Sequence, residues 1–234
     1  GLNYYLKTYL DMTGEIKKSY FYESNMTTPT FNRRLGQALV CTDYFLNVIE
    51  HGSAIPTIFH LTGGQWRITE PTQDYERLPL FQTAKFVNTY CKGLALKTEY
   101  ETQYTISNSK GRILEYKPVG AYAYSKEDQH SIVLISRDFE NDHYVQLNLP
   151  DDLSFESNAT KYIITGQDYS TVDETIDSTS MNLIDNMIVK VPKYSMVLIS
   201  YTGDNQQFDP LPLAYYGYKK QESVTIEPED AVIN

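Results

Sequence analysis

The sequence contains little of what builds disulfide frameworks, metal clusters or membrane spans. Cys41 and Cys91 are its only cysteines, and neither belongs to a CxxC pair or a Cys/His cluster. We therefore predict two buried, unpaired thiols, no metal ion and no cofactor, because HExxH, GxSxG and Gly-rich phosphate loops are also absent. The longest apolar runs fall far short of the roughly 20 residues that cross a bilayer, so no membrane segment is predicted.

Basic residues are in the minority. The 20 Lys and Arg stand against 30 Asp and Glu, and the formal net charge is -10. A surface of this sign repels phosphate backbones, which argues against a nucleic-acid partner. Asp138, Glu140, Asn141 and Asp142 could crowd around a Ca²⁺ ion, but acidic hairpin tips are usually only solvated, so no ion is predicted there.

Tyrosine is the abundant aromatic residue, with 21 copies beside 9 Phe and a single Trp. Such rings fill sheet cores, and they also stack on the apolar faces of sugars. The sheet core is the favoured interpretation.

The first 95 residues alternate between helical and strand patterns. Apolar residues recur at helical spacing over 2–10, 35–49 and 80–91, and short apolar runs over 18–23 and 54–61 predict buried strands between these helices. This order is the repeat of a parallel α/β sheet. A complete eightfold barrel takes about 250 residues, so this part could supply only its final quarter.

From about residue 96 the pattern changes to the period-2 alternation of strands. Strands are predicted over 95–105, 112–117, 119–125, 130–137, 143–149, 160–166, 187–192 and 195–202. Short strands at this spacing are typical of an antiparallel β-sandwich. A long loop with one short strand is predicted over 167–186. The predicted division is an α/β part (1–95), an all-β sandwich (96–203) and an extended C-terminal tail (204–234).

Glu23 is the candidate catalytic residue. It directly follows the apolar run Tyr20-Phe-Tyr22, and a charge at the end of a buried strand needs a reason. In α/β barrels the functional groups lie at the carboxyl ends of the strands, because the following loops converge on one open face.

Several segments, taken in order, resemble retaining glycoside hydrolases of the α-L-arabinofuranosidase type. YFYESN (20–25) and the helix RRLGQALVCTDYFLNVIEHG (33–52) look like the seventh strand and helix of their (β/α)8 barrel. Residues 55–66 look like the eighth strand and its loop, and LPLFQTAKFVNTYCKG (78–93) looks like the last helix. HSIVLISRDFENDHYVQLNLP (130–150) looks like paired sandwich strands, with Ser136-Arg137 where these families carry Asn-Arg.

The resemblance implies a fold and a set of roles. Residues 1–95 would be the last βα units of a (β/α)8 catalytic barrel, followed by the sandwich. Glu23 would be the nucleophile, Asn25 would take the place of the family's Asn, and Tyr22 replaces a usually small residue. His60, Gln65 and Trp66 would bind the sugar, although His60 could equally be a core histidine and Trp66 could seal a domain interface.

The same resemblance implies an incomplete site. A retaining enzyme uses two carboxyl groups about 5 to 5.5 Å apart, and in these families the acid/base is a Glu on the fourth strand. Residues 1–234 would thus hold the nucleophile but lack the acid/base. The expected partners are a carbohydrate substrate, such as an arabinofuranoside, and a missing N-terminal barrel segment or a second copy of the chain. Localisation is not fixed by the sequence, although a secreted or periplasmic enzyme would fit.

Two other functions remain open. The sandwich could be a non-catalytic carbohydrate-binding module carrying a barrel remnant, with exposed coplanar aromatics among Tyr116, Tyr122, Tyr124 and Tyr144. Alternatively, the chain could be a structural protein whose open strand edges pair with another chain.

Overall fold

The computed structural model describes Met12 and residues 19–24, 31–50, 53–58, 60–62, 67–71, 74, 76–99, 104–107, 113–149, 158–184 and 186–203. Over 19–24, 53–58, 60–62, 104–107 and 113–116 it describes the backbone. The helix predicted over 2–10 and the tail over 204–234 lie outside the described residues.

The N-terminal part is built on two parallel strands. β1 (Ser19–Ser24) pairs in parallel with β2 (Ser53–Ile58), and α2 (Leu35–Glu50) connects them. β3 (His60–Thr62) pairs with β4 (Arg67–Thr69), and α3 (Pro79–Tyr90) follows. The predicted parallel pairing is therefore confirmed for β1 and β2. The single strand predicted over 54–61 is wrong, because β2 and β3 belong to different two-stranded sheets.

The C-terminal part is an antiparallel β-sandwich, as predicted. Its main sheet has six strands in the order β12-β11-β14-β9-β8-β5. These strands are β5 (Leu94–Leu96), β8 (Val119–Lys126), β9 (Gln129–Ser136), β11 (Asn158–Thr165), β12 (Thr175–Asn182) and β14 (Ser195–Thr202). Two further antiparallel pairs are β10 (His143–Leu147) with β13 (Met187–Val191), and β6 (Tyr104–Ser107) with β7 (Ile113–Tyr116).

One expectation for this half is corrected, and another is confirmed. The strand predicted over 95–105 is two short strands, β5 and β6, which lie in different sheets. The one strand predicted within 167–186 is confirmed: it is the eight-residue β12, which pairs along its full length with β11. Ser, Thr and Asp dominate β12 because it is an exposed edge strand with little apolar area to bury.

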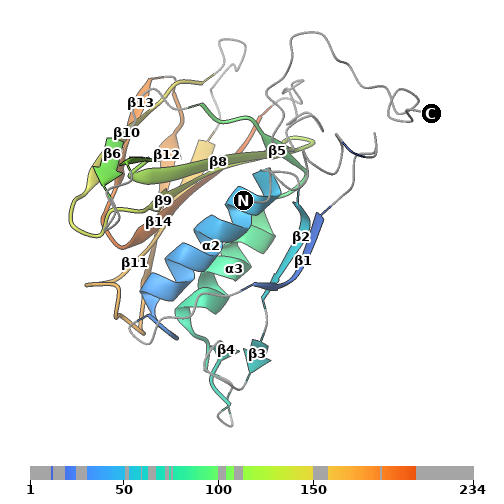
Figure 1. Ribbon diagram of the computed structural model, residues 1–234. Coiled ribbons are helices and arrows are strands. Elements are labelled where there is room, and N and C mark those ends of the chain that lie inside the picture. The colour runs from blue at the N-terminus through green and yellow to red at the C-terminus, as the bar shows by residue number, and fades with distance from the viewer. Residues whose placement is uncertain are drawn as a thin grey trace.

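The six-stranded sheet is covered on both faces. Along β9, Ile132 and Leu134 pack with the β10–β13 pair, whereas Val133 and Ile135 pack with α2. This burial on two sides explains why β9 reads as a continuous apolar run although it is antiparallel. Figure 1 shows the resulting layers, with α2 and α3 between the six-stranded sheet and the β1–β2 pair.

Helix α2 buries two stripes of side chains. Leu35, Leu39 and Leu46 face the sandwich, and Ala38 and Cys41 face the region of α3 and β4. A helix buried on two sides shows the strong apolar periodicity that made its prediction over 35–49 succeed. Among the described helices, none has the length and apolar character needed to span a membrane.

Gly93 ends the α3 region, as its place in the sequence predicts. Its φ is +77°, and a Cβ there would lie 2.2 Å from the backbone oxygen of Ser125. Only glycine adopts this conformation at so close an approach. The chain then enters β5, which pairs with β8 at the edge of the main sheet.

Candidate active site

The two parallel strands end at one edge, and Glu23 lies there. Glu23 is the penultimate residue of β1, and its neighbour Ser24 pairs with Ile58, the last residue of β2. Figure 1 shows β3, β4 and the start of α2 at this same end of the molecule. This is the end of a parallel α/β unit at which functional residues gather.

The β1–β2 ladder is irregular at Glu23. Phe21 pairs with Pro56 and Ser24 pairs with Ile58, so β1 advances by three residues while β2 advances by two. Two residues of β1, Tyr22 and Glu23, therefore lie opposite a single residue of β2, the one that follows Pro56. Proline has no backbone N–H to give to a ladder, and bulges next to active sites turn the backbone so that a side chain can be redirected.

The other predicted site residues are placed only in part. His60 begins β3, two positions beyond the end of β2, and pairs with Arg67. The structure thus brings the backbones of Glu23 and His60 to the same edge. Asn25, Gln65 and Trp66 lie outside the described residues, and the roles of all five remain predictions.

An ion cluster lies between the start of α2 and the end of β4. Arg67 donates to Oε2 of Glu70 through Nε at 2.8 Å and Nη2 at 2.5 Å. Arg33, just before α2, approaches Oε1 of the same carboxylate at 3.5 Å. This long, exposed contact brings segment 31–34 close to the residue that follows β4. Sequence reasoning missed it, because no local spacing pairs residues that are 37 positions apart.

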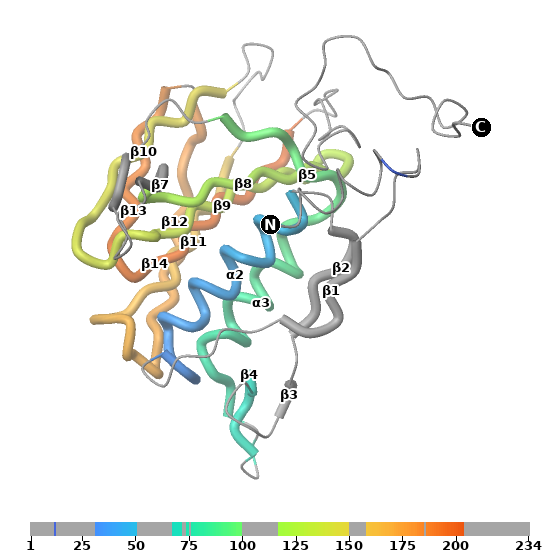
Figure 2. The backbone as a smooth tube through the Cα atoms, in the orientation of Figure 1, coloured from blue at the N-terminus to red at the C-terminus, as the bar shows by residue number. Residues whose placement is uncertain are grey.

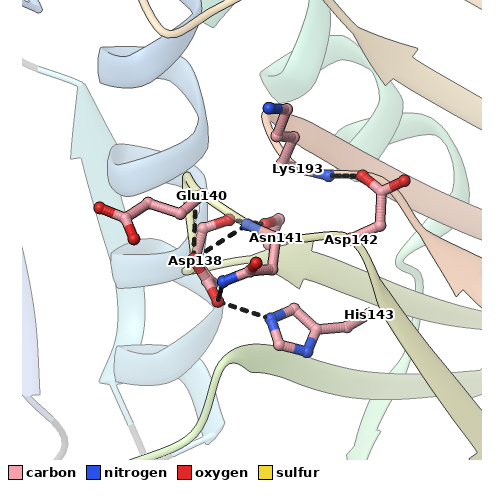
Figure 3. Close-up of polar contacts among 7 residues, drawn as sticks. Asp138, Glu140, Asn141, Asp142, His143 and Lys193 are labelled. Carbon is pink, nitrogen blue, oxygen red and sulfur yellow. Dashed lines mark hydrogen bonds and ion pairs between the residues drawn. The ribbon is translucent and has the colours of Figure 1, made fainter.

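The acidic loop after β9 is closed by its own hydrogen bonds (Figure 3). Asp138 Oδ1 accepts the N–H of Glu140 at 2.8 Å, and Asp138 Oδ2 lies 2.9 Å from His143 Nε2. Burial would raise the pKa of Asp138, but these bonds and those from Asn141 lower it to about 2. Asp142 turns instead to the N–H of Lys193. Within the described ranges, no three His, Cys, Asp or Glu residues are grouped to hold a metal.

The sandwich tyrosines do not form the exposed platform considered above. Tyr122 and Tyr124 are only 2% and 4% exposed, so that expectation is wrong for both. Tyr144 is 68% exposed on β10, and the side chain of Tyr116 lies outside the described part of the structure.

Neither cysteine forms a disulfide, as predicted, but only one of the two is fully buried. Cys41 is buried and Cys91 is partly buried. Burial raises the pKa of the Cys91 thiol to about 12. A thiol in that state is protonated at neutral pH and is not a nucleophile.

Comparisons with known proteins identify the fold. Neither protein-family models nor curated protein sequences match the chain. Several solved structures resemble the chain. One is an α-L-arabinofuranosidase from Thermotoga maritima, which aligns with a TM-score of 0.63 and 15% sequence identity. The alignment covers 85% of this chain and 46% of the arabinofuranosidase chain. The family 51 α-L-arabinofuranosidase of Thermotoga petrophila RKU-1 has a TM-score of 0.60 at 15% identity, covering 85% and 48%.

A family 30 subfamily 8 xylanase, Xyn30A from Clostridium acetobutylicum, has a TM-score of 0.57 at 11% identity, covering 80% of this chain and 43% of its own. The fold is therefore shared with arabinofuranosidases and xylanases, and the chain spans less than half the length of each of these three structures.

Proposed function

We propose that this chain is the C-terminal part of a retaining glycoside hydrolase, with Glu23 as the nucleophile. The observation that carries the proposal is the position of Glu23 at the carboxyl end of β1, in an irregular stretch of its pairing with the parallel strand β2. The shared fold with arabinofuranosidases and xylanases supports it. We assign 1–95 to the end of a (β/α)8 barrel, 96–203 to the sandwich and 204–234 to a tail.

The reaction would be a double displacement. The carboxylate of Glu23 attacks the anomeric carbon, the glycosidic C–O bond breaks, and a second carboxyl group gives its proton to the leaving oxygen. Water then attacks the same carbon, the ester to Glu23 breaks, and the second group takes up the proton of that water. Both steps balance without a cofactor.

The second carboxyl group is expected on other polypeptide. A barrel of this type needs eight parallel strands, whereas β1 and β2 form a pair. The acid/base would come from one of the remaining strands, supplied by an N-terminal segment or by another copy of the chain. Asn25, His60, Gln65 and Trp66 would contact the sugar, with arabinofuranosides or related glycans as the substrate class.

Mechanism-based inactivators test the assignment of Glu23. The protein tested would contain residues 1–234 together with the rest of the barrel. It would be treated with arabinofuranosyl, xylosyl and glucuronyl inactivators, and its peptides would then be analysed by mass spectrometry. We expect an adduct on Glu23, its loss in Glu23→Gln, and its retention in Glu70→Gln, which alters a neighbouring carboxylate at the same edge. An adduct on a different carboxylate, or substrate hydrolysis by Glu23→Gln at the wild-type rate, would contradict the proposal.

One observation favours a second candidate, a glycan-binding sandwich. Tyr144 and Ile188 are 68% and 65% exposed on the outer face of the β10–β13 pair. An exposed ring of this kind can stack on a sugar. Retarded migration of the chain in gels containing arabinan or xylan, lost in Tyr144→Ala, would support binding there. Equal migration with and without the glycans would exclude it for these polymers.

A further inference from the structure

The start of helix α2 has one local side-chain acceptor, Oε1 of Gln37, and it takes the N–H of Arg33 at 2.5 Å rather than an N–H of the helix. The residue before it, Arg34, has no side-chain oxygen, and the first turn contains no acidic residue. The first N–H groups of a helix need acceptors from elsewhere, because no preceding turn supplies them. This helix directly follows the segment that leads away from Glu23.

The β11–β12 turn (166–174) supplies these acceptors. The backbone oxygen of Thr171 accepts the N–H of Leu35 at 2.8 Å, and that of Tyr169 accepts the N–H of Gly36 at 2.9 Å. Between them, the oxygen of Ser170 accepts Nη1 of Arg34 at 2.6 Å. Three consecutive carbonyl groups of the sandwich thus meet the positive end of α2. Figure 2 shows this turn against the start of the helix.

The turn is held in shape by its own hydrogen bonds. Oδ1 of Asp168 accepts both the N–H and the hydroxyl of Ser170, at 2.6 and 2.5 Å. The N–H of Thr171 bonds to the backbone oxygen of Asp168 at 3.3 Å. The carbonyl groups are therefore oriented before they meet the helix, which lowers the entropy lost on contact.

Aromatic rings fix the chain just before α2. Phe31 packs edge-on against Tyr169, with ring centroids 5.1 Å apart, and against Phe139 at 6.2 Å. A Cβ on Gly36 would lie 3.0 Å from the Phe31 ring and 3.1 Å from both Cβ and O of Tyr169. The turn, Phe31 and the first turn of α2 are thus in close contact.

We propose that the β11–β12 turn is a positioning element of the candidate active site. It holds segment 31–36, which begins eight positions after Glu23 and leads directly into α2, the helix that connects β1 to β2. The inference rests on the proposed function, since it assigns the sandwich a part in placing the nucleophile. Tyr169 acts through the backbone and does not touch the substrate.

The test compares Tyr169→Ala, Tyr169→Phe and the control Ile184→Ala, which changes a side chain that is 56% exposed, in the protein with its complete barrel. Every contact found for the Tyr169 side chain is made by its ring or Cβ, so Tyr169→Phe should behave as wild type. For Tyr169→Ala we expect hydrogen exchange at the amides of Leu35 and Gly36 to be about tenfold faster. The control should leave it unchanged.

The second readout separates positioning from folding. At saturating inactivator, we expect the rate constant for Glu23 labelling in Tyr169→Ala to fall about tenfold, while circular dichroism shows the same folded fraction. Faster exchange with an unchanged labelling rate would overturn the positioning role and leave the proposed function intact. Failure of the wild type to label at Glu23, while it hydrolyses substrate, would overturn both, and the exchange data would then report a helix cap alone.

Gly36→Ala provides an independent variant. Alanine in place of glycine inside a helix ordinarily stabilises it by up to about 1 kcal/mol, but here the new methyl group would press on Phe31 and on the backbone of Tyr169. We expect faster exchange at Leu35 and a lower melting temperature. A raised melting temperature with unchanged exchange at Leu35 would show that the β11–β12 turn can move away without loosening the start of α2. That result would overturn the proposal.

Discussion

Arg137 joins α2 to the six-stranded sheet through a bidentate ion pair. Its Nε and Nη2 each lie 2.9 Å from an oxygen of Asp43, and Nη2 also bonds to the hydroxyl oxygen of Tyr122 at 3.0 Å. Tyr122 in turn donates to Asp43 Oδ1 at 2.8 Å. The network links β8, α2 and the residue that follows β9.

Replacing Arg137 should destabilise the protein measurably. Arg137→Met keeps most of the side-chain volume but leaves the partly buried Asp43 without its cation, at a cost of about 1–2 kcal/mol. Urea unfolding would measure this cost. Arg33→Met is the control, because its contact with Glu70 is long and exposed and should contribute less than about 0.5 kcal/mol. Equal effects of the two substitutions would contradict the assignment.

Asp138 makes stability depend on pH in the acid range. Its folded-state pKa is about 2, below the ordinary value of 3.8, because of hydrogen bonds that outweigh partial burial. A carboxyl group with a lowered pKa stabilises the fold above its unfolded pKa, and this contribution is lost as pH falls from about 3.8 towards 2.

Asp138→Asn should therefore weaken the fold at neutral pH and flatten its loss of stability between about pH 4 and pH 2. Melting temperatures recorded across this range would show both effects. Glu140→Gln is the control, since its carboxylate has no partner among the described residues. The interpretation fails if Asp138→Asn keeps the wild-type slope.

For single residues, the sequence predicts the place of a residue in its helix or strand better than its tertiary contacts. Glu23 was found from an apolar run that ends in a charge, and the structure puts it at a strand end. The ion pair between Arg137 and Asp43 spans 94 positions and joins two layers. Nothing local in the sequence predicts such a pair, since tertiary packing alone brings its charges together.

Among the elements, α2 and α3 are held together by a buried polar contact. The hydroxyl of Thr42 donates to that of Thr83 at 2.8 Å, and Thr83 donates weakly to the backbone oxygen of Leu80. Both threonines are almost fully buried. A buried hydroxyl group that loses its partner costs more than one that is removed together with its partner.

A double-mutant cycle tests this contact. Thr42→Val alone should cost about 1 kcal/mol of unfolding free energy, whereas Thr42→Val with Thr83→Val should cost less than the sum of the two single changes. Urea unfolding of the four proteins gives the coupling energy. Strict additivity would show that the hydroxyl groups contribute separately.

Elements with one clear periodicity were predicted, and those without it were not. The helix at 35–49 and the strand at 195–202 are marked by buried apolar residues, and α2 and β14 agree with them to within a residue. The single strand predicted within 167–186 is β12, but its bounds were not predicted, because an exposed edge strand of Ser, Thr and Asp shows no alternation. The cap of α2 is missed because its acceptors are backbone groups of the β11–β12 turn.

In the molecule as a whole, the two halves share one core. Leu35, Leu39 and Leu46 of α2 are at most 1% exposed and pack on the sheet face that carries Val133 and Leu198. Burial of one such side chain stabilises by about 1.5–3 kcal/mol, so three contribute on the order of 5–9 kcal/mol. This is comparable to the whole stability of an ordinary domain, and neither half is expected to be stable alone.

Leu39→Ala tests whether the halves unfold together. The cavity should cost about 2–5 kcal/mol. Trp66, the single tryptophan, belongs to the N-terminal half of the sequence and is followed by fluorescence, while far-ultraviolet circular dichroism follows the helices and strands of both halves together. With a shared core, both probes should show the same shift in urea midpoint, and Leu134→Ala, on the other face of the sheet, should also shift both. If Leu39→Ala moves the fluorescence transition alone, the sandwich folds independently of the N-terminal half. That result would favour the hypothesis of a glycan-binding module over that of a sandwich integral to a barrel enzyme.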